Sequence, residues 1–183
     1  MSAILCPKCN RPYEVSEATF DHPYQYSESG LSGIQLIGVT VYSCPNCEVE
    51  SADIPHMNCL HNLIAKDIIL TPLPMSGKEL RFLRKETNLK PKEFAERLGV
   101  DPKTIGNWET SDKLSRQVDT LVRLFVSMEL WQGQDMIKTL EQLADLLKYD
   151  WEEEADLSVA QLALVNTILG LNDKQEWDFP KAA

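Results

Sequence analysis

The chain has 183 residues, of which 43% are hydrophobic and 25% are charged, and its formal net charge is −10. This composition predicts one full domain or two small ones and excludes an intrinsically disordered chain. The charge is unevenly distributed: residues 1–75 carry 3 Lys/Arg against 8 Asp/Glu, residues 76–126 carry 11 against 8, and residues 127–183 carry 4 against 12. Because only the middle segment is basic, it is the candidate face for nucleic acid.

The sequence gives no sign of membrane insertion or export. It contains no run of about 18 apolar residues, the length that a helix needs to cross a bilayer. Its first residues, MSAILCPKC, lack the basic start and long apolar segment of a signal peptide. We therefore expect a cytoplasmic protein with no membrane partner.

Two Cys-Pro-x-Cys pairs, Cys6 with Cys9 and Cys44 with Cys47, are separated by 34 residues. In an intracellular chain this spacing favours a metal over disulfides. Two such turns complete the tetrahedral sulfur shell that Zn²⁺ prefers, and because protein fills all four positions we expect one structural zinc per chain. Iron in a rubredoxin-type or iron–sulfur site uses the same ligands and is the alternative. A thioredoxin-like redox enzyme would need one such motif on a βαβ unit, which the pattern does not indicate.

Short strands are predicted between the cysteine pairs. Apolar residues alternate there with polar or small ones at Tyr24 and Tyr26, Ile34 and Leu36, and Val39 and Val41. Ser29-Gly30 and Ser32-Gly33 supply turns. We expect a zinc ribbon with a small sheet and a thin core, in which a structural zinc contributes on the order of 10 kcal/mol to folding.

The segment after the second cysteine pair predicts a helix and a linker. His56, Cys59 and His61 could form a second metal site, but a fourth ligand is missing, and a helix-lining thiol with two surface histidines is the simpler interpretation. A short helix is expected from about Asn58 to Ile69. The prolines of Thr71-Pro-Leu-Pro-Met75 then form a stiff linker.

Three short helices are predicted between Ser76 and Glu109. Apolar residues keep helical spacing at Leu80 and Leu83, at Phe94, Ala95 and Leu98, and at Ile105 and Trp108. Start and stop signals fall between these groups: a capping box at Ser76 and Glu79, Pro91 at the start of the second helix, Gly99 at its end, and Asp101-Pro102 at the start of the third. Helix, tight glycine turn and helix is the arrangement that reads DNA.

The run F-A-E-R-L-G-V-D-P-K-T-I-G-N-W-E resembles the Xre/Cro-type helix-turn-helix. The resemblance implies that Ala95 stays small so that two helices approach, and that Arg84 forms a partly buried ion pair with Glu109. It also implies that the outer face of the third helix reaches base edges in a major groove, through Lys103, Thr104, Gly106 and Asn107. A solvated face without a ligand is the alternative.

Contacts with the DNA backbone are expected beside this face. We expect Lys92 and Lys113, near helix ends, to contact phosphates. The family commonly has Gln where this chain has Pro91, so one usual backbone contact is missing.

The C-terminal part is predicted to be helical. The helical pattern continues from Leu114 to Trp131, and Met136, Leu140, Leu143 and Leu147 then repeat at helical spacing. A second helix is suggested by Leu157, Leu162, Leu164, Val165, Ile168 and Leu169. A hairpin packed back on the core, dimerisation and partner contact are all open interpretations. Trp151-Glu-Glu-Glu154 is expected to be a solvated acidic loop, and residues 172–183 to be frayed.

A ribbon of the form C-P-x-C, a span ending G-V-x-V-Y-x-C-P-x-C, a linker and an Xre-type domain together resemble the MqsA (YgiT-type) family over about residues 4–126. This family of zinc-finger/helix-turn-helix proteins includes bacterial antitoxins. The resemblance implies a ribbon that binds a toxin and a second domain that dimerises and binds a palindromic operator, repressing its own operon. By position, Lys103 and Asn107 would read bases.

These observations predict an α+β fold with four parts. A zinc-ribbon domain spans residues 1–70, a linker 71–75, an all-α Xre-type domain 76–126, and an acidic helical extension 127–183. The function hypothesis is a homodimeric, sequence-specific DNA-binding repressor with a structural zinc and no enzymatic activity. The alternative is an interaction protein that neutralises a toxin through the ribbon or tail, with DNA binding serving autoregulation.

Overall fold

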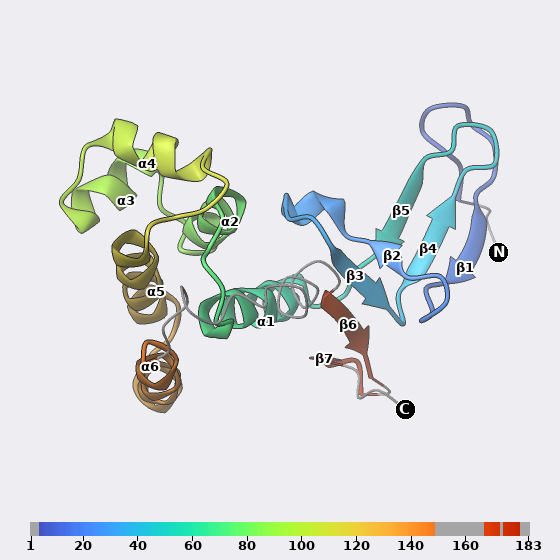
Figure 1. The fold of residues 1–183 in the computed structure, drawn as a ribbon. Coiled ribbons are helices and arrows are strands. Elements are labelled where there is room, and N and C mark those ends of the chain that lie inside the picture. The colour runs from blue at the N-terminus through green and yellow to red at the C-terminus, as the bar shows by residue number, and fades with distance from the viewer. Residues whose placement is uncertain (1–3, 149–166, 173, 180–183) are drawn as a thin grey trace. The chain divides into compact units, whose positions relative to one another are not determined.

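The computed structural model of the chain describes residues 4–148, 167–172 and 174–179. These residues form two compact units (Figure 1). Of the described residues, the ribbon unit contains 4–27, 32–60, 167–172 and 174–179, and the helical unit contains 28–31 and 61–148. The boundary between the two units falls within helix α1 (Met57–Leu70). This helix confirms the one predicted from about Asn58 to Ile69.

A small antiparallel sheet in the ribbon unit carries the cysteine turns. Strands β1 (Glu14–Glu17), β4 (Thr40–Ser43) and β5 (Glu50–Asp53) lie in the order β1-β4-β5. The register pairs Ser43 with Glu14 on one side and with Glu50 on the other. The first cysteine pair therefore precedes β1 at the same end of the sheet where the second connects β4 to β5. The predicted short antiparallel sheet and the α+β class are confirmed.

A second sheet joins the two ends of the chain. Its order is β2 (Tyr24–Gln25), β3 (Ile34–Ile37), β6 (Thr167–Leu171) and β7 (Trp177–Asp178), with β6 parallel to β3 and the other pairs antiparallel. Leu36 pairs with Leu169 in this register, and both side chains are fully buried. Figure 1 shows β6 alongside β3. The short 3-10 turn η1 (Ser27–Ser29) precedes β3.

This sheet corrects two expectations for the C-terminal part. The second helix is wrong for residues 167–171, because their backbone pairs with β3; the Thr-Ile-Leu-Gly-Leu run, with β-branched residues and a glycine, suits a strand. Residues 157–166 of that prediction and the loop at 151–154 lie outside the described residues. The terminus was also expected to be frayed, yet Trp177 lies in β7 and its indole N–H donates to the carbonyl of Pro55 at 2.8 Å.

The three predicted short helices are α2 (Gly77–Glu86), α3 (Pro91–Leu98) and α4 (Pro102–Glu109). Their ends follow the sequence signals. The backbone N–H of Ser76 donates to the Glu79 carboxylate at 2.6 Å, and Gly99 ends α3 in the left-handed conformation with a φ of 69°. The Asp101 carboxylate accepts from the N–H of Lys103 at 2.8 Å and caps α4. The core of these helices is made of fully buried Leu80, Leu83, Phe94, Ala95 and Ile105.

A buried charge pair on helix α5 (Arg116–Leu130) fixes the segment between α1 and α2. Asp119 and Arg123 are 0% and 1% exposed and form an ion pair four residues apart. Arg123 donates to the carbonyls of Ile68, Ile69, Thr71 and Leu73. The Asp119 carboxylate accepts from the backbone N–H of Met75 at 2.7 Å. Residues 71–75 are therefore anchored by side chains as well as stiffened by prolines, and Leu73 and Met75 are buried.

The last described helix of the helical unit is α6 (Gly133–Leu146), which packs on α5. This helix confirms the one predicted around Met136 to Leu147. Its Leu143 and Leu146 side chains are buried. The indole N–H of Trp131 donates to the Asn62 side chain at 2.8 Å and ties the α5–α6 junction to α1. Among the described helices, none is both long and apolar enough to span a membrane.

Candidate metal centre and nucleic-acid interface

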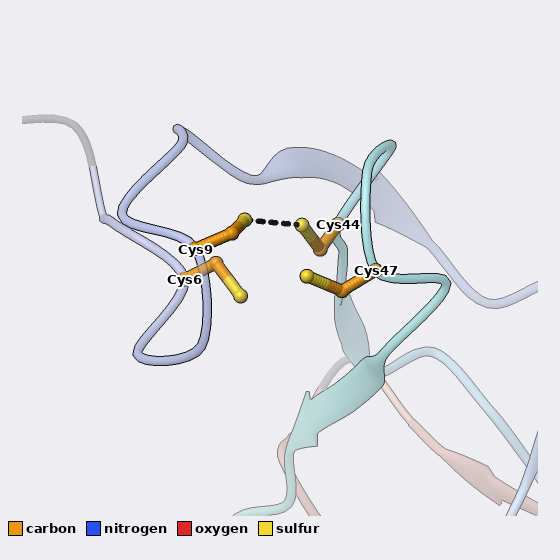
Figure 2. Close-up of side chains that lie close together, drawn as sticks. All are labelled: Cys6, Cys9, Cys44 and Cys47. Carbon is orange, nitrogen blue, oxygen red and sulfur yellow. Dashed lines mark hydrogen bonds between the residues drawn. The ribbon is translucent and has the colours of Figure 1, made fainter.

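The four paired cysteines come together at one end of the β1-β4-β5 sheet. The ligand atoms of Cys6, Cys9, Cys44 and Cys47 all lie within 4.8 Å of one another, and Figure 2 shows the four sulfur atoms directed toward a common centre. The closest sulfurs, those of Cys9 and Cys44, are 3.4 Å apart. In a tetrahedral site with Zn–S bonds of about 2.3 Å, neighbouring sulfurs would lie roughly 3.8 Å apart. The cluster therefore fits a tetrahedral metal ion.

The two cysteine turns share one backbone design. In the first, the N–H of Cys6 donates to the carbonyl of Arg11 at 2.8 Å, and the N–H of Asn10 donates to the carbonyl of Cys6 at 2.8 Å. In the second, the backbone N–H of Cys44 donates to the carbonyl of Val49 at 2.9 Å, and the N–H of Glu48 donates to the carbonyl of Cys44 at 3.0 Å. The fourth residue after each first cysteine has a positive φ, 60° at Asn10 and 54° at Glu48. The turns are thus held in shape by backbone hydrogen bonds as well as by any bound metal.

The protein surroundings favour the thiolate at Cys6. Burial raises the pKa of this thiol, but hydrogen bonds from the backbone of Lys8 and Cys9 and from the side chains of Cys44 and Tyr13 outweigh that effect and lower it from 9.0 to about 6. Conversely, burial, the hydrogen bond to Cys6 and the nearby thiolates raise the pKa of Tyr13. Thiolate is the form of cysteine that ligates metals.

A second metal cluster at His56, Cys59 and His61 is not formed. Of the residues that the structure describes, only the four paired cysteines form a group able to hold a metal. His61 instead lies against α2, where its Nδ1 is 2.9 Å from a carboxylate oxygen of Glu86 and its ring contacts Phe82 edge-on. Cys59 is an exposed thiol on α1.

Helix α4 is held against α2 by two close contacts. Arg84 Nε lies 2.5 Å from Glu109 Oε1, and the same guanidinium donates to the carbonyl of Leu89 at 2.9 Å. At the other end of α2, a Cβ on Gly77 would lie 2.4 Å from the carbonyl oxygen of Trp108, so the two backbones touch. Side chain and backbone together therefore fix the orientation of α4.

The face of α4 opposite these contacts is exposed and carries no acidic group. Lys103, Gly106 and Asn107 are exposed and lie three and four residues apart, on one face, while Thr104 is half-buried. Lys92 in the first turn of α3 and Lys113 between α4 and α5 are both exposed. Ile105 on the inner face is fully buried. The structure thus places a basic, a small and a polar residue, Lys103, Gly106 and Asn107, on one exposed face of α4.

Some supporting residues were not found by sequence reasoning. Asp119 and Arg123 were not singled out, although their i,i+4 spacing of opposite charges was visible in the sequence. That spacing is usual on solvent-exposed helices and gives no sign of burial. The backbone hydrogen bonds that support the cysteine turns could not be predicted either. In the sequence, only Asn10, a residue type that favours turns, indicated them.

Helix, turn and recognition-type helix with this ion-paired scaffold define a helix-turn-helix segment. In the comparisons with known proteins, a family model described as Helix-turn-helix matches residues 80–123, which span α2 to α5. No curated protein and no solved structure matches the chain. The match supports the Xre-type resemblance and a DNA-binding regulatory class for this segment.

Proposed function

We propose that the protein is a sequence-specific DNA-binding transcriptional repressor that reads its operator with α4. One observation carries the proposal: the exposed face of Lys103, Gly106 and Asn107 is held rigidly within a segment that matches a helix-turn-helix family. An operator covered by the protein would be closed to transcription. Such a role in chromosome binding also fits the expected cytoplasmic location.

The proposed reading uses the hydrogen-bonding capacity of two side chains. Asn107 can pair with the N6 and N7 atoms of adenine in two hydrogen bonds, and Lys103 can donate to the O6 and N7 atoms of guanine. Thr104 is close enough on the helix to contact a base edge or phosphate. Lys92 and Lys113 would contact phosphates. The pairing of Lys92 with Glu96 spans 3.9 Å between largely exposed side chains, so it is weak enough to be exchanged for a phosphate.

Selection from a pool of random-sequence duplexes with the full-length chain tests this proposal. We expect enrichment of one motif. Asn107→Ala should weaken binding to that motif by roughly 1–3 kcal/mol and relax the preference at one position. Lys113→Ala should weaken all duplexes alike and reduce the salt slope by about one unit. Lys138→Ala, on the exposed surface of α6, is the matched control. If no motif is enriched, the proposed function fails.

We also propose that the four-cysteine cluster holds one structural zinc per chain. When bound, the metal would crosslink the two turns and leave no open coordination position for catalysis. Elemental analysis of the purified protein should give one zinc per chain, and Cys9→Ser should abolish it. Cys59→Ser is the matched control because that exposed thiol is not part of the cluster. Iron at this stoichiometry would replace zinc as the metal but keep the structural role.

The protein is further proposed to act as a homodimer on a palindromic operator. Leu121, Leu124 and Met128 on α5 are 41%, 37% and 62% exposed and share one helix face by their spacing of three and four. Because these three side chains are uncharged, the same face of a second copy could cover them around a two-fold axis without like-charge repulsion. Two recognition helices would then be placed about 34 Å apart, one turn of DNA.

Sedimentation of the full chain tests the dimer. Met128→Glu should shift the protein from dimer to monomer and weaken binding to paired half-sites without loss of helix content. Ile137→Glu, an equally apolar exposed site on α6, is the matched control. A wild-type chain that is monomeric both free and on DNA would contradict the proposal.

A second candidate function is the neutralisation of a basic toxin by the ribbon unit. Both edge strands of the β1-β4-β5 sheet carry exposed acidic side chains: Glu14 and Glu17 on β1, and Glu50 and Asp53 on β5. This charge suits a basic protein partner. Purification of the chain together with the products of neighbouring genes tests this candidate: a stoichiometric complex lost in Glu14→Lys/Glu17→Lys would support it, and the absence of any complex would exclude it.

A further inference from the structure

The helix-turn-helix segment contains three glycines, and for two of them the protein itself supplies the reason. A Cβ on Gly77 would lie 2.4 Å from the carbonyl oxygen of Trp108, a distance that no side chain tolerates. Gly99 ends α3 with a φ of 69°, in the left-handed region that favours glycine. Packing explains the first glycine and backbone geometry the second.

Gly106 has no such internal reason. It lies in the middle of α4, and its φ is not positive. Apart from its chain neighbours and the backbone of α4 itself, no heavy atom of the described residues lies within 4 Å of a Cβ built on it. Glycine is among the poorest helix formers, so alanine would suit the isolated protein better at this position. Any reason for glycine at this position would therefore have to lie outside the described residues.

The surface around Gly106 indicates what would approach it. Lys103 and Asn107 lie one turn before it and next to it on the exposed face, and both are hydrogen-bonding side chains. Gly106 itself offers only its Cα hydrogens, because its carbonyl lies within the helix and accepts from the Thr110 hydroxyl at 3.2 Å. The face thus has an open space where a side chain at position 106 would lie, called the hollow below, beside two polar side chains.

We propose that Gly106 is the point of closest approach between α4 and the DNA, and that the hollow receives the C5-methyl group of a thymine. The inference rests on the proposed function. Among the groups that base pairs present in the major groove, the thymine methyl is the apolar one, while the others donate or accept hydrogen bonds. An apolar hollow without a donor or acceptor fits that methyl, and Lys103 and Asn107 take the polar edges of adjacent base pairs.

The proposal makes Gly106 a specificity-determining residue. It can be tested from both sides, by adding a methyl group to the protein and by removing one from the DNA. An alanine methyl at position 106 would occupy the same space as the thymine methyl. Deoxyuridine pairs as thymidine does but lacks that methyl, so it should relieve the overlap. A steric effect that disappears on removing one methyl from the DNA cannot come from a change in folding of the variant.

The experiment uses full-length wild-type protein, Gly106→Ala, and the duplex that wild type selects from a random-sequence pool. Each thymine of the selected site is replaced in turn by deoxyuridine, and binding is measured by fluorescence anisotropy. Gln134→Ala, an exposed position on α6, is the control for surface substitution. We expect Gly106→Ala to bind the thymine duplex at least tenfold more weakly than wild type, with a melting temperature no lower than that of wild type. One deoxyuridine duplex should restore its binding to within threefold of wild type.

Each other outcome overturns the inference. Wild-type affinity of Gly106→Ala for every duplex would mean that the DNA does not come close to this position. Equal weakening on all deoxyuridine duplexes would mean that the approaching group is not a thymine methyl. A lowered melting temperature would reveal an internal need for glycine. If wild type selects no sequence, the proposed function fails and this inference with it, whereas the first three results leave the proposed function intact.

Discussion

Arg123→Met should be among the most destabilising substitutions in the helical unit. The guanidinium is 1% exposed, pairs with a fully buried carboxylate and donates to four backbone carbonyls in the last turn of α1 and the segment that follows it. Methionine keeps much of the side-chain length but leaves Asp119 as a buried charge without its cation. Breaking a buried ion pair from one side costs about 3–5 kcal/mol, and the carbonyls that lose their donor add to that cost. We expect a loss of about 4 kcal/mol, a large part of the 5–15 kcal/mol typical of a folded domain.

Urea unfolding followed by far-ultraviolet circular dichroism measures this loss. Arg97→Met is the matched control, because Arg97 also bonds a carboxylate, that of Glu129 at 2.6 Å, but the two side chains are 50% and 27% exposed. That substitution should cost less than about 1 kcal/mol. Hydrogen exchange at the Met75 amide, which donates to Asp119, should accelerate in Arg123→Met and not in the control.

A double variant separates the charge from the packing. Asp119→Leu/Arg123→Met removes both charges, so this double variant should be more stable than Arg123→Met alone. Its stability should stay below that of wild type, because the Met75 amide has lost its acceptor. The reasoning about this buried pair is wrong if the free energy of unfolding of Arg123→Met lies within about 1 kcal/mol of the wild-type value. It is also wrong if Arg123→Met unfolds at a urea concentration no lower than that of Arg97→Met.

Three further results are expected. Chelation should unfold the cysteine turns and the β1-β4-β5 sheet while most helical circular dichroism persists; complete loss of helix signal would show that the helical unit also depends on the metal. Gly77→Ala should destabilise the helical unit by about 1–3 kcal/mol, because its Cβ meets the backbone of α4 at 2.4 Å, and an unchanged urea midpoint would contradict that packing. A chain ending at residue 166 should lose β6, expose Leu36 and lower the stability of the ribbon unit by at least about 2 kcal/mol. Hydrogen exchange in β3 measures this effect, and unchanged protection would mean that β6 contributes little.

Much of the fold could be predicted because its signals are local. The spacing of the cysteine pairs indicated the metal cluster, and the cap residues Ser76, Gly99 and Asp101 marked the ends of helices that the structure places accordingly. Each of these signals depends on residues a few positions apart. The exposed face of α4 followed from the same helical spacing, whereas its contact with DNA stays a proposal.

The features that could not be predicted depend on distant partners. Ile168 and Leu169 lie in a short apolar run whose spacing fits a helix as well as a buried strand, and the choice was made by β3, far away in the sequence. The residues next to Arg123 in the sequence do not indicate that its guanidinium binds the carbonyls of α1 and the following segment. In both cases the deciding interaction is non-local, so no window of sequence contains it.

The pairing of β3 with β6 has a consequence for synthesis on the ribosome. Helices α2, α3 and α4 follow one another closely in the sequence and contact one another, so they can form as soon as they emerge from the exit tunnel. Strand β3 is made much earlier, yet one of its edges must wait for Thr167–Leu171, which are translated more than a hundred residues later. During that interval the unpaired edge and the apolar side chain of Leu36 are open to other nascent chains. The newly made chain therefore passes through a stage in which α2, α3 and α4 can be folded while β3 still lacks one of its partner strands.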